Sequence, residues 1–226
     1  MRILVATATS PEVQPLISRL RYLSDTGMRC ASYRFRQHDV DVLTTGVGMV
    51  ATAAWCSRAC AAEHYDLALN FGVCGSFDPG LPPGSVVHVT ADCFSELGAE
   101  DGDELLSLQQ LKLLDGDEFP FEGGRLVNAS PPAIAPLMEL RQVSGITVNT
   151  VHGNERTIGE VRARYQPDIE SMEGAAFMYS CLVAGVPFAQ VRAVSNVVER
   201  RNRAAWKLDE AINALGAAAV QLLESA

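Results

Sequence analysis

Two polar side chains, Glu173 and Asn196, stand where apolar segments of the chain change direction, and their types suit the recognition of a nucleoside. Glu173 follows Met172 and precedes the Gly-Ala-Ala start of a predicted helix. Its two oxygens, carried on one rigid group, can accept hydrogen bonds from two neighbouring ribose hydroxyls. The alternative is an acid that only marks a helix start. Asn196 ends a β-branched, alanine-rich strand, where open α/β sheets place their ligands, so it is the candidate reader of the base.

Glu12 is a third candidate on the same rim of the predicted sheet. The segment Ser10-Pro11-Glu12 first indicates a helix start, with Ser10 as the cap, proline at the first helical position and an acid in the first turn. Glu12 also follows the first predicted strand at its carboxyl end, as Asn196 follows a later one. A catalytic role for Glu12 therefore stands beside the purely structural one.

Two glycine-rich turns reach this rim and allow a ligand to approach the backbone closely. They are Thr45-Gly46-Val47-Gly48 and Phe71-Gly72-Val73-Cys74-Gly75-Ser76. Taken singly, each is ordinary turn chemistry. Neither contains the Lys-Ser/Thr pair of a P-loop or a complete dinucleotide-binding pattern, so ATP and NAD are disfavoured.

Arg192 lies within an apolar predicted strand and needs a partner, because an unpaired buried guanidinium is costly. We predict Glu12 as that partner. Three more arginines, Arg200, Arg201 and Arg203, follow in the next loop. By default this loop is solvated, but guanidinium groups are also suited to receive a substrate carboxylate.

The alternation of apolar patterns predicts an α/β fold, in which a mixed central sheet is covered by helices on both faces. Strands are expected at 2–7, 30–35, 40–45, 67–71, 85–90, 146–151 and 188–194. Helices are expected at 11–23, 50–63, 133–141, 155–165, 174–184 and 209–223. The acidic, glycine-bearing insert 96–118 has little periodicity and is predicted to be a loop or lid.

Length and composition predict one globular domain over residues 1–226. Of the 226 residues, 48% are hydrophobic and 20% charged, which suits a single large core. A net charge of −9 disfavours nucleic-acid partners, which require a basic face. Six cysteines without a CxxC pair indicate reduced thiols in a cytoplasmic protein, and neither a metal nor a cofactor is expected. No tract predicts a signal peptide or a membrane span.

Five motifs, in order along nearly the whole chain, resemble those of the purine nucleoside phosphorylase and nucleosidase superfamily. They are Ser-Pro-Glu-Val, Thr-Gly-Val-Gly-Met-Val-Ala, Asn-Phe-Gly-Val-Cys-Gly, Ser-Met-Glu-Gly-Ala-Ala and Val-Arg-Ala-Val-Ser-Asn. Residues 96–102, 149–155 and 195–206 are similar to the futalosine hydrolases, which act in a route to menaquinone. For mechanism, the chain also resembles the methylthioadenosine/S-adenosylhomocysteine nucleosidases. The resemblance implies hydrolysis of an N-glycosidic bond, with futalosine as the expected substrate, by a homo-oligomer.

The resemblance also implies a role for each of the main site residues. Glu12 would activate the attacking water, and Arg192 would support both Glu12 and the water. Glu173 would hold the ribose hydroxyls with Met172 against the sugar, and Asn196 would meet the purine.

Further residues are expected to line the binding site, namely Gly72, Val73, Val151, His152, Arg201 and Trp206. The resemblance places Val151 and His152 beside the base and Trp206 at an aromatic position beside the ligand. Arg201, with the neighbouring arginines, is expected to meet the carboxylate on the 5′ extension of futalosine.

Two departures from the methylthioadenosine nucleosidases bear on the substrate, since those enzymes carry aspartate at Asn196 and serine at Val73. A carboxamide can donate to O6 of a 6-oxopurine while accepting from a protonated N7, whereas a carboxylate repels O6. Asn196 therefore predicts hypoxanthine as the leaving base, and such sites discriminate by ~10⁴ or more. Two alternatives stay open. One is a nucleosidase or phosphorylase acting on inosine, methylthioadenosine or S-adenosylhomocysteine, and the other is an inactive nucleoside-binding sensor.

Overall fold

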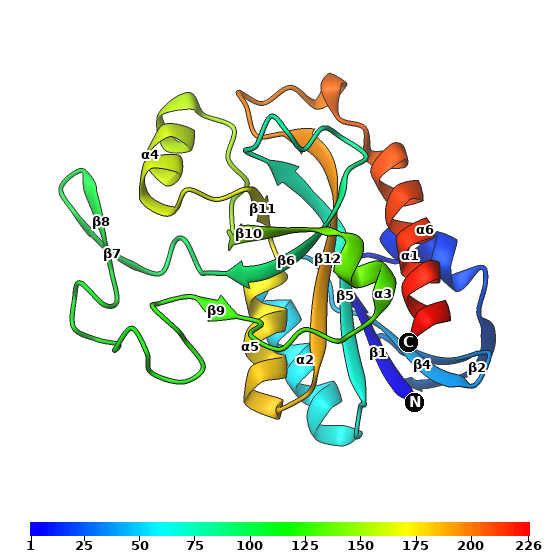
Figure 1. The fold of residues 1–226 in the computed structure, drawn as a ribbon. Helices are drawn as coiled ribbons and strands as arrows, with labels where there is room; N and C mark the ends of the chain where they lie inside the picture. The colour runs from blue at the N-terminus through cyan, green and yellow to red at the C-terminus, as the bar shows by residue number, and fades with distance from the viewer.

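The computed structural model describes residues 1–226 and contains one large mixed sheet with helices on both faces (Figure 1). The strands lie in the order β11-β10-β6-β12-β5-β1-β4-β3-β2, with β9 beside β6. The predicted α/β fold with a mixed, helix-flanked sheet is confirmed. The strands are β1 Arg2–Thr7, β2 Arg21–Gly27, β3 Cys30–Phe35, β4 His38–Thr44, β5 Leu67–Ser76, β6 Val86–Asp92, β9 Leu126–Val127, β10 Arg141–Thr147, β11 Ile169–Ser171 and β12 Phe188–Val197.

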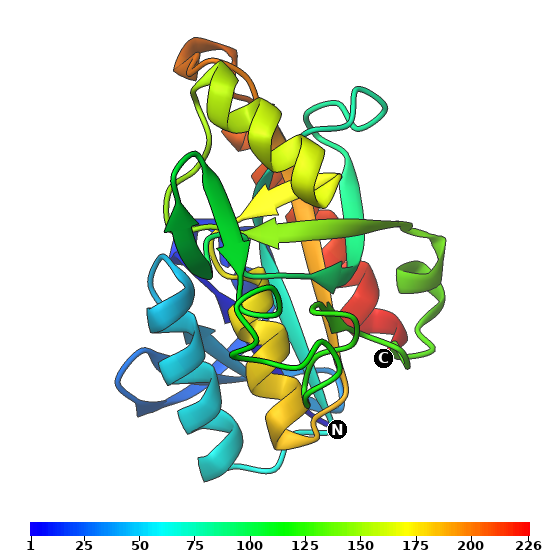
Figure 2. The same cartoon turned by 90° about the vertical axis from the view of Figure 1, so that its left-hand side faces the viewer.

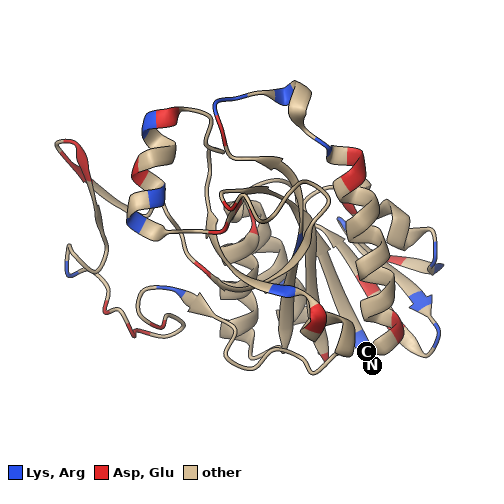
Figure 3. Cartoon of the chain, turned by 45° about the horizontal axis from the view of Figure 1, so that its top comes forward, with Lys and Arg blue, Asp and Glu red and all other residues tan.

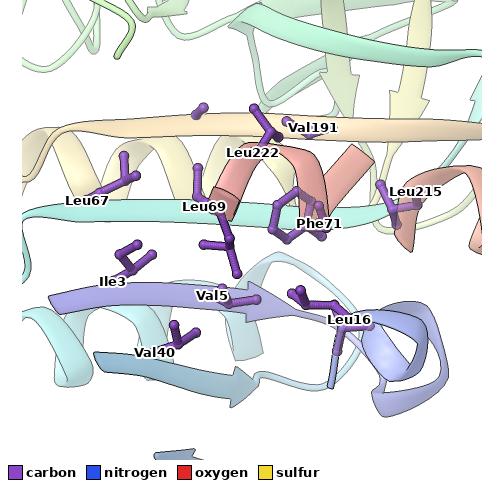
Figure 4. Close-up of a cluster of buried hydrophobic side chains, with 14 of the residues drawn as sticks. Ile3, Val5, Leu16, Val40, Leu67, Leu69, Phe71, Val191, Leu215 and Leu222 are labelled. Atoms are coloured by element: carbon purple, nitrogen blue, oxygen red, sulfur yellow. The ribbon is translucent and has the colours of Figure 1, made fainter. Parts of the chain in front are cut away.

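The helices divide between the two faces of the sheet because side chains alternate along the central strands. Ile3 and Val5 of β1 join the cluster beneath α1 and α6 (Figure 4), whereas Leu4 and Ala6 join the cluster beneath α2 and α5. None of the helices has the length and apolar composition needed to cross a bilayer. The helices are α1 Ser10–Ile17, α2 Met49–Ala62, α3 Ala135–Glu139, α4 Glu155–Tyr165, α5 Gly174–Ala184 and α6 Leu208–Ser225, with a short 3-10 turn at Arg203–Ala205.

One end of the sheet closes on itself through the three-residue strand β11. This strand pairs in parallel with β10 and in antiparallel with the end of β5, where Glu170 lies opposite Gly75. The ring β5-β12-β6-β10-β11 is thereby completed. The sequence did not predict this strand, because three buried residues carry no periodicity that separates a strand from a turn.

A register shift in β12 sets the residues at the carboxyl end of the sheet. Arg192 pairs with Gly72 of β5 in regular parallel register, but the pairing shifts between Val194 and Asn196. Because Ser195 is the extra residue, Asn196 is aligned with Gly75. A bulge of this kind redirects the side chain that follows it.

The predicted helix at 11–23 is wrong beyond Ile17. Residues Arg21–Gly27 instead form β2, the edge strand of a hairpin with β3. All seven residues of β2 are exposed, so no alternation between buried and exposed positions reveals the strand.

The second half of the chain shows two smaller differences from the prediction. The strand expected at 146–151 lies earlier, at Arg141–Thr147, because the helix α3 ends at Glu139 and Leu140 already has extended backbone angles. The insert expected as a loop or lid contains a two-stranded hairpin, β7 Gly98–Asp101 and β8 Glu104–Ser107, which projects from the molecule (Figure 1).

Candidate active site

Glu12 is buried at the start of α1, and its two carboxylate oxygens have different surroundings. Oε2 accepts hydrogen bonds from the Thr9 backbone N–H at 2.8 Å, the Thr9 hydroxyl at 2.9 Å and the Thr7 hydroxyl at 3.2 Å. Oε1 accepts from the backbone N–H of Val73 at 3.2 Å. The cap of α1 is Thr9, not Ser10 as predicted, and Glu12 completes the capping box. Glu12 thus has a structural oxygen and a second oxygen with capacity for a water.

Arg192 is fully buried, and its expected ion pair with Glu12 is not formed. Its nearest carboxylate is that of Glu173, where Nη1 lies 3.8 Å from Oε2. Its Nε donates to Gln190 at 3.1 Å and its Nη2 donates to the side-chain oxygen of Asn70. The prediction fails because the carboxylate of Glu12 is held by threonine and backbone donors instead.

Glu173 caps α5 and faces the glycine-rich turn before α2. Its Oε1 accepts from the backbone N–H of Gly48 at 3.0 Å, and Gly48 has a φ of +97°, which favours glycine. Burial raises the pKa of Glu173 and the charge of Glu12 adds to the rise, while Arg192 and the Gly48 N–H oppose it. The charges of Glu12 and Arg192 therefore both act on Glu173, and the three side chains form one charged cluster.

Three residues that sequence reasoning missed complete a buried polar network behind this group. Gln190, which orients Arg192, donates through Nε2 to Asp92 at 3.1 Å. Burial raises the pKa of Asp92 to about 6, although Gln190, Thr147 and Arg192 oppose the rise. Asn70 links the guanidinium to the carbonyl of Ala6 at 3.0 Å. For Asn70 and Gln190 the available signal was a polar residue within an otherwise apolar predicted strand, at 67–71 and at 188–194.

Gly72 makes room for this arrangement. A Cβ at position 72 would lie 2.0 Å from Nη1 of Arg192 and 3.3 Å from Oε1 of Glu12. The guanidinium therefore occupies the space that any larger residue would fill. The next residue, Val73, donates its N–H to Glu12, so both Gly72 and Val73 lie against the charged side chains Glu12 and Arg192.

Asn196 lies at the carboxyl end of β12, half-buried and close to the closure of the sheet. Its Oδ1 accepts from the Ser195 hydroxyl at 2.8 Å, and its Nδ2 donates to the carbonyl of Val197 at 3.0 Å. Each group keeps a free lone pair or hydrogen for a ligand. The amide is thus available at the rim where the sequence predicted it.

Val151 and His152 were expected beside the base, and Met172 against the sugar. Val151 and Met172 are half-buried and pack against the cluster that contains Val198. His152 binds the buried carboxylate of Glu170, with 2.6 Å between Nδ1 and Oε2 and 3.1 Å between its backbone N and Oε1. This contact raises the pKa of His152.

Arg201 and Trp206 belong to the loop after β12, which lies against the same segment. The Arg201 guanidinium stands over the Trp206 ring at 5.8 Å, and its backbone N–H donates to Gly153 at 3.2 Å. Figure 3 shows basic positions in this loop, at the top of the view, and on the neighbouring helix α4. Both residues therefore border the His152 side of the rim and make no contact with Glu12 or Glu173.

The insert also borders this side. A cavity of about 500 Å³ lies between the β7–β8 hairpin and α4, and its walls include Glu104, His152, Arg156 and Tyr165. The structure brings no three His, Cys, Asp or Glu side chains together in a group that could hold a metal ion.

Comparison with known proteins identifies the class to which this fold and site belong. The family model described as "Phosphorylase superfamily" matches residues 2–225. The chain belongs to this superfamily, which confirms the resemblance inferred from the five motifs.

Within that superfamily the chain is similar to proteins named futalosine hydrolase. It is 32% identical to the one from Streptomyces coelicolor, with 95% of this chain and 92% of that protein covered. It is also 32% identical to the one from Thermus thermophilus, with 80% of each covered. The solved futalosine hydrolase of Helicobacter pylori superposes with a TM-score of 0.83 at 12% identity, over 100% of this chain and 98% of that one. The last comparison bears on the fold alone.

Proposed function

We propose that this protein hydrolyses the N-glycosidic bond of futalosine, releasing hypoxanthine and dehypoxanthine futalosine for menaquinone synthesis. The relatives named futalosine hydrolase support this substrate. The observation that supports the reaction is the difference between the surroundings of the two carboxylate oxygens of Glu12. Three donors hold Oε2, whereas Oε1 has one donor and faces Gly72 beside Arg192.

Glu12 acts as the general base. Breaking the bond gives the ribose oxocarbenium character, and a water must then lose a proton as it attacks the sugar carbon. A carboxylate fixed through one oxygen can present the other to that water without reorganising. Arg192, within 3.8 Å of Glu173 and beside Gly72, offsets the negative charge of the two carboxylates.

Glu173 and Asn196 bind the two halves of the nucleoside. The carboxylate of Glu173 accepts from the ribose hydroxyls, and Met172 packs against the sugar. Asn196 donates to O6 of hypoxanthine and accepts from N7–H after N7 of the departing base has taken a proton from solvent, which stabilises the leaving group.

Water is favoured over phosphate as the nucleophile. The N–H of Val73, which an anion at the turn would need, already binds Glu12 at 3.2 Å. Two buried carboxylates share a single buried arginine, so the charge of Arg192 is already offset before any phosphate binds. A phosphorylase would require the opposite balance.

A chromatographic assay of base release tests this function. Purified protein is given futalosine, inosine and methylthioadenosine, each with and without phosphate. We expect hypoxanthine from futalosine at a rate that phosphate does not change, and much slower release from the other two. Release that requires phosphate would identify a phosphorylase, and hypoxanthine binding without turnover would identify a sensor.

The protein also acts as a homo-oligomer in the cytoplasm under this proposal. The adjacent helices α2 and α5 (Figure 2) leave Val50, Tyr179 and Val183 exposed, and Val47 is exposed in the turn beside Gly48. These apolar side chains suit burial against a second copy. All six cysteines are free thiols, in keeping with a reducing compartment. Sedimentation analysis of the wild type and of Val50→Glu tests the oligomer, which the added charge should weaken.

A further inference from the structure

The carboxylate of Asp92, at the end of β6, is fully buried and has no part in the mechanism above. Its Oδ1 accepts from the Cys93 backbone N–H at 2.8 Å and from the Thr147 hydroxyl at 3.1 Å. Its Oδ2 accepts from Nε2 of Gln190 at 3.1 Å. A neutral asparagine would satisfy the two donors at Oδ1 without the cost of burying a charge. The reason for an acid at this position therefore lies at Oδ2.

Gln190 stands between two groups that each allow only one kind of hydrogen bond. Nε of Arg192 always donates, and Oε1 of Gln190 accepts from it at 3.1 Å. Burial raises the pKa of Asp92 to about 6, so the carboxyl is ionised at neutral pH and can only accept. Nε2 of Gln190 also lies 3.2 Å from the sulfur of Met178, a second acceptor. The amide is therefore held in one orientation, with its oxygen toward the guanidinium.

A second branch of the network joins Asp92 to helix α5. The Thr147 hydroxyl that donates to Asp92 accepts in turn from the Ala175 backbone N–H at 2.7 Å. Ala175 lies in the first turn of α5, and the N-cap of this helix is Glu173. One carboxylate thus anchors both Arg192 and the helix start that carries Glu173.

Gly174 brings the helix start directly against this network. A Cβ at position 174 would overlap Oε1 of Gln190 and Oδ2 of Asp92. The hydrogen-bonded pair therefore packs on the backbone of α5, and a change in the orientation of either side chain would reach the helix.

We propose that Asp92 is a positioning residue for the hydrolysis, which fixes both Arg192 and Glu173 at the reacting centre. It acts on the guanidinium through Gln190 and on the helix start through Thr147. The inference rests on the proposed function and deepens it. Nη1 of Arg192 lies 3.8 Å from Oε2 of Glu173, and the two groups act together on the charge that develops on the ribose. A displacement of about 1 Å can cost about 10²-fold in rate.

Kinetics of Asp92→Asn test this role. Asparagine keeps Oδ1 for the Cys93 N–H and the Thr147 hydroxyl, and only the atom that faces Gln190 changes from an acceptor to a donor. The Gln190 amide must then turn its oxygen toward position 92, so Nε of Arg192 loses its acceptor. We expect kcat for futalosine to fall about 10²-fold, while hypoxanthine affinity, measured by calorimetry, stays unchanged. An unaltered kcat, or an equal loss of hypoxanthine affinity, would overturn the proposal.

The double variant Asp92→Asn/Gln190→Glu separates positioning from a structural role. The asparagine donates to one oxygen of the new carboxylate, whose other oxygen accepts from Nε of Arg192, so each hydrogen bond and the total charge are restored. We expect kcat to recover at least about tenfold relative to Asp92→Asn. Gln190→Glu alone sets two carboxylates against each other and should also be slow. If each substitution only loosened the core, the double variant would be slower than either single one, and that outcome would overturn the proposal.

Asp168→Asn is the matched control. The carboxylate of Asp168 likewise accepts from a backbone N–H and a hydroxyl, those of Ser144, at 2.7 and 3.1 Å. It makes no hydrogen bond with Gln190 or Arg192. Its substitution should leave kcat nearly unchanged, and a loss as large as that of Asp92→Asn would overturn the assignment.

Gln190→Met keeps the proposal testable if Asp92→Asn does not fold. Methionine has a similar volume but leaves Nε of Arg192 without its acceptor, so kcat should fall about 10²-fold with hypoxanthine binding retained. Full kcat in this variant would show that the link to Asp92 does not position the guanidinium. A wild type that releases no base from futalosine would refute the proposed function and this role together, whereas normal wild-type turnover with full kcat in the variants would refute the role of Asp92 alone.

Discussion

The two sides of the candidate site are built differently. On the ribose and water side, Glu12, Glu173 and Arg192 are all buried, and contacts from several elements hold each of them. On the base side, Asn196 follows a bulge, His152 stands in a loop, and Glu170 belongs to a three-residue strand. Under the proposed function, the reacting groups lie on a long central strand and at helix starts, and the groups that recognise the base lie on the rim. Such a division allows the base preference to change without disturbing the reacting groups.

The largest effect is expected from Glu12→Gln. Glutamine also suits the third helical position of a capping box, so α1 should remain intact while the general base is lost. We expect turnover of futalosine to fall ~10² to 10⁴-fold with hypoxanthine affinity nearly unchanged. Single-turnover kinetics and calorimetry measure the two quantities. A variant that keeps more than about a tenth of the wild-type rate would remove Glu12 from catalysis.

The two glycines of the turn offer a direct comparison of the two sides. In Gly72→Ala the new Cβ meets a fully buried guanidinium at 2.0 Å, so Arg192 must leave its partners. Displacement of this kind should cost about 10² in kcat and lower the melting temperature. In Gly75→Ala the close neighbours are side-chain atoms of Val198 at 2.8 Å and Asn196 at 3.3 Å. That variant should mainly raise KM, and equal effects on kcat would contradict the division.

Asn196→Asp should alter the base preference. The carboxylate repels O6 of hypoxanthine and, when protonated, can donate to N7. We expect kcat/KM for futalosine to fall by at least about 10², while release of adenine from methylthioadenosine is kept or gained. Assays of both substrates measure the ratio, and an unchanged ratio would mean that Asn196 does not read the base.

Arg201→Ala tests the outer edge of the base side. Loss of a charged contact to the carboxylate of futalosine should raise KM about ten- to hundredfold and leave the slow hydrolysis of inosine unchanged. Arg200→Ala and Arg203→Ala, in the same loop, serve as matched comparisons. Equal losses on futalosine and inosine would indicate that Arg201 supports the loop instead.

The smallest effect is a pH dependence, which we expect from His152 on the base side of the site. Glu170 raises the pKa of His152 above its ordinary 6.5, so the ion pair is complete below pH 6.5 and is lost as the pH rises through the folded-state pKa. Hypoxanthine affinity should fall about threefold across that step, the size of a modest ion pair. His152→Gln should flatten the profile above pH 6.5, and a profile that persists in this variant would place the titration elsewhere.

Local sequence was sufficient for some parts of the site and insufficient for others. Glu173 and Asn196 were selected as candidates because each polar residue lies at the end of an apolar segment. Arg192 was recognised as a buried charge, but its partner was assigned wrongly. The pairing depends on which donors saturate Glu12, and these come from Thr7 and Thr9 through the local turn. Glu170 was overlooked although it directly precedes the motif that contains Glu173, because its neighbours across the sheet are far from it in sequence.

By itself, the sequence determined the α/β class and the superfamily, and it selected the candidate reacting side chains, because periodicity and ordered motifs are local properties. The tertiary structure alone decided how these side chains meet. The closure of the sheet by β11 and the bulge at Ser195 set Glu170 and Asn196 on either side of Gly75, and the absent side chain of Gly72 admits Arg192. Such contacts depend on strand register between segments about a hundred residues apart, and no local pattern encodes that register.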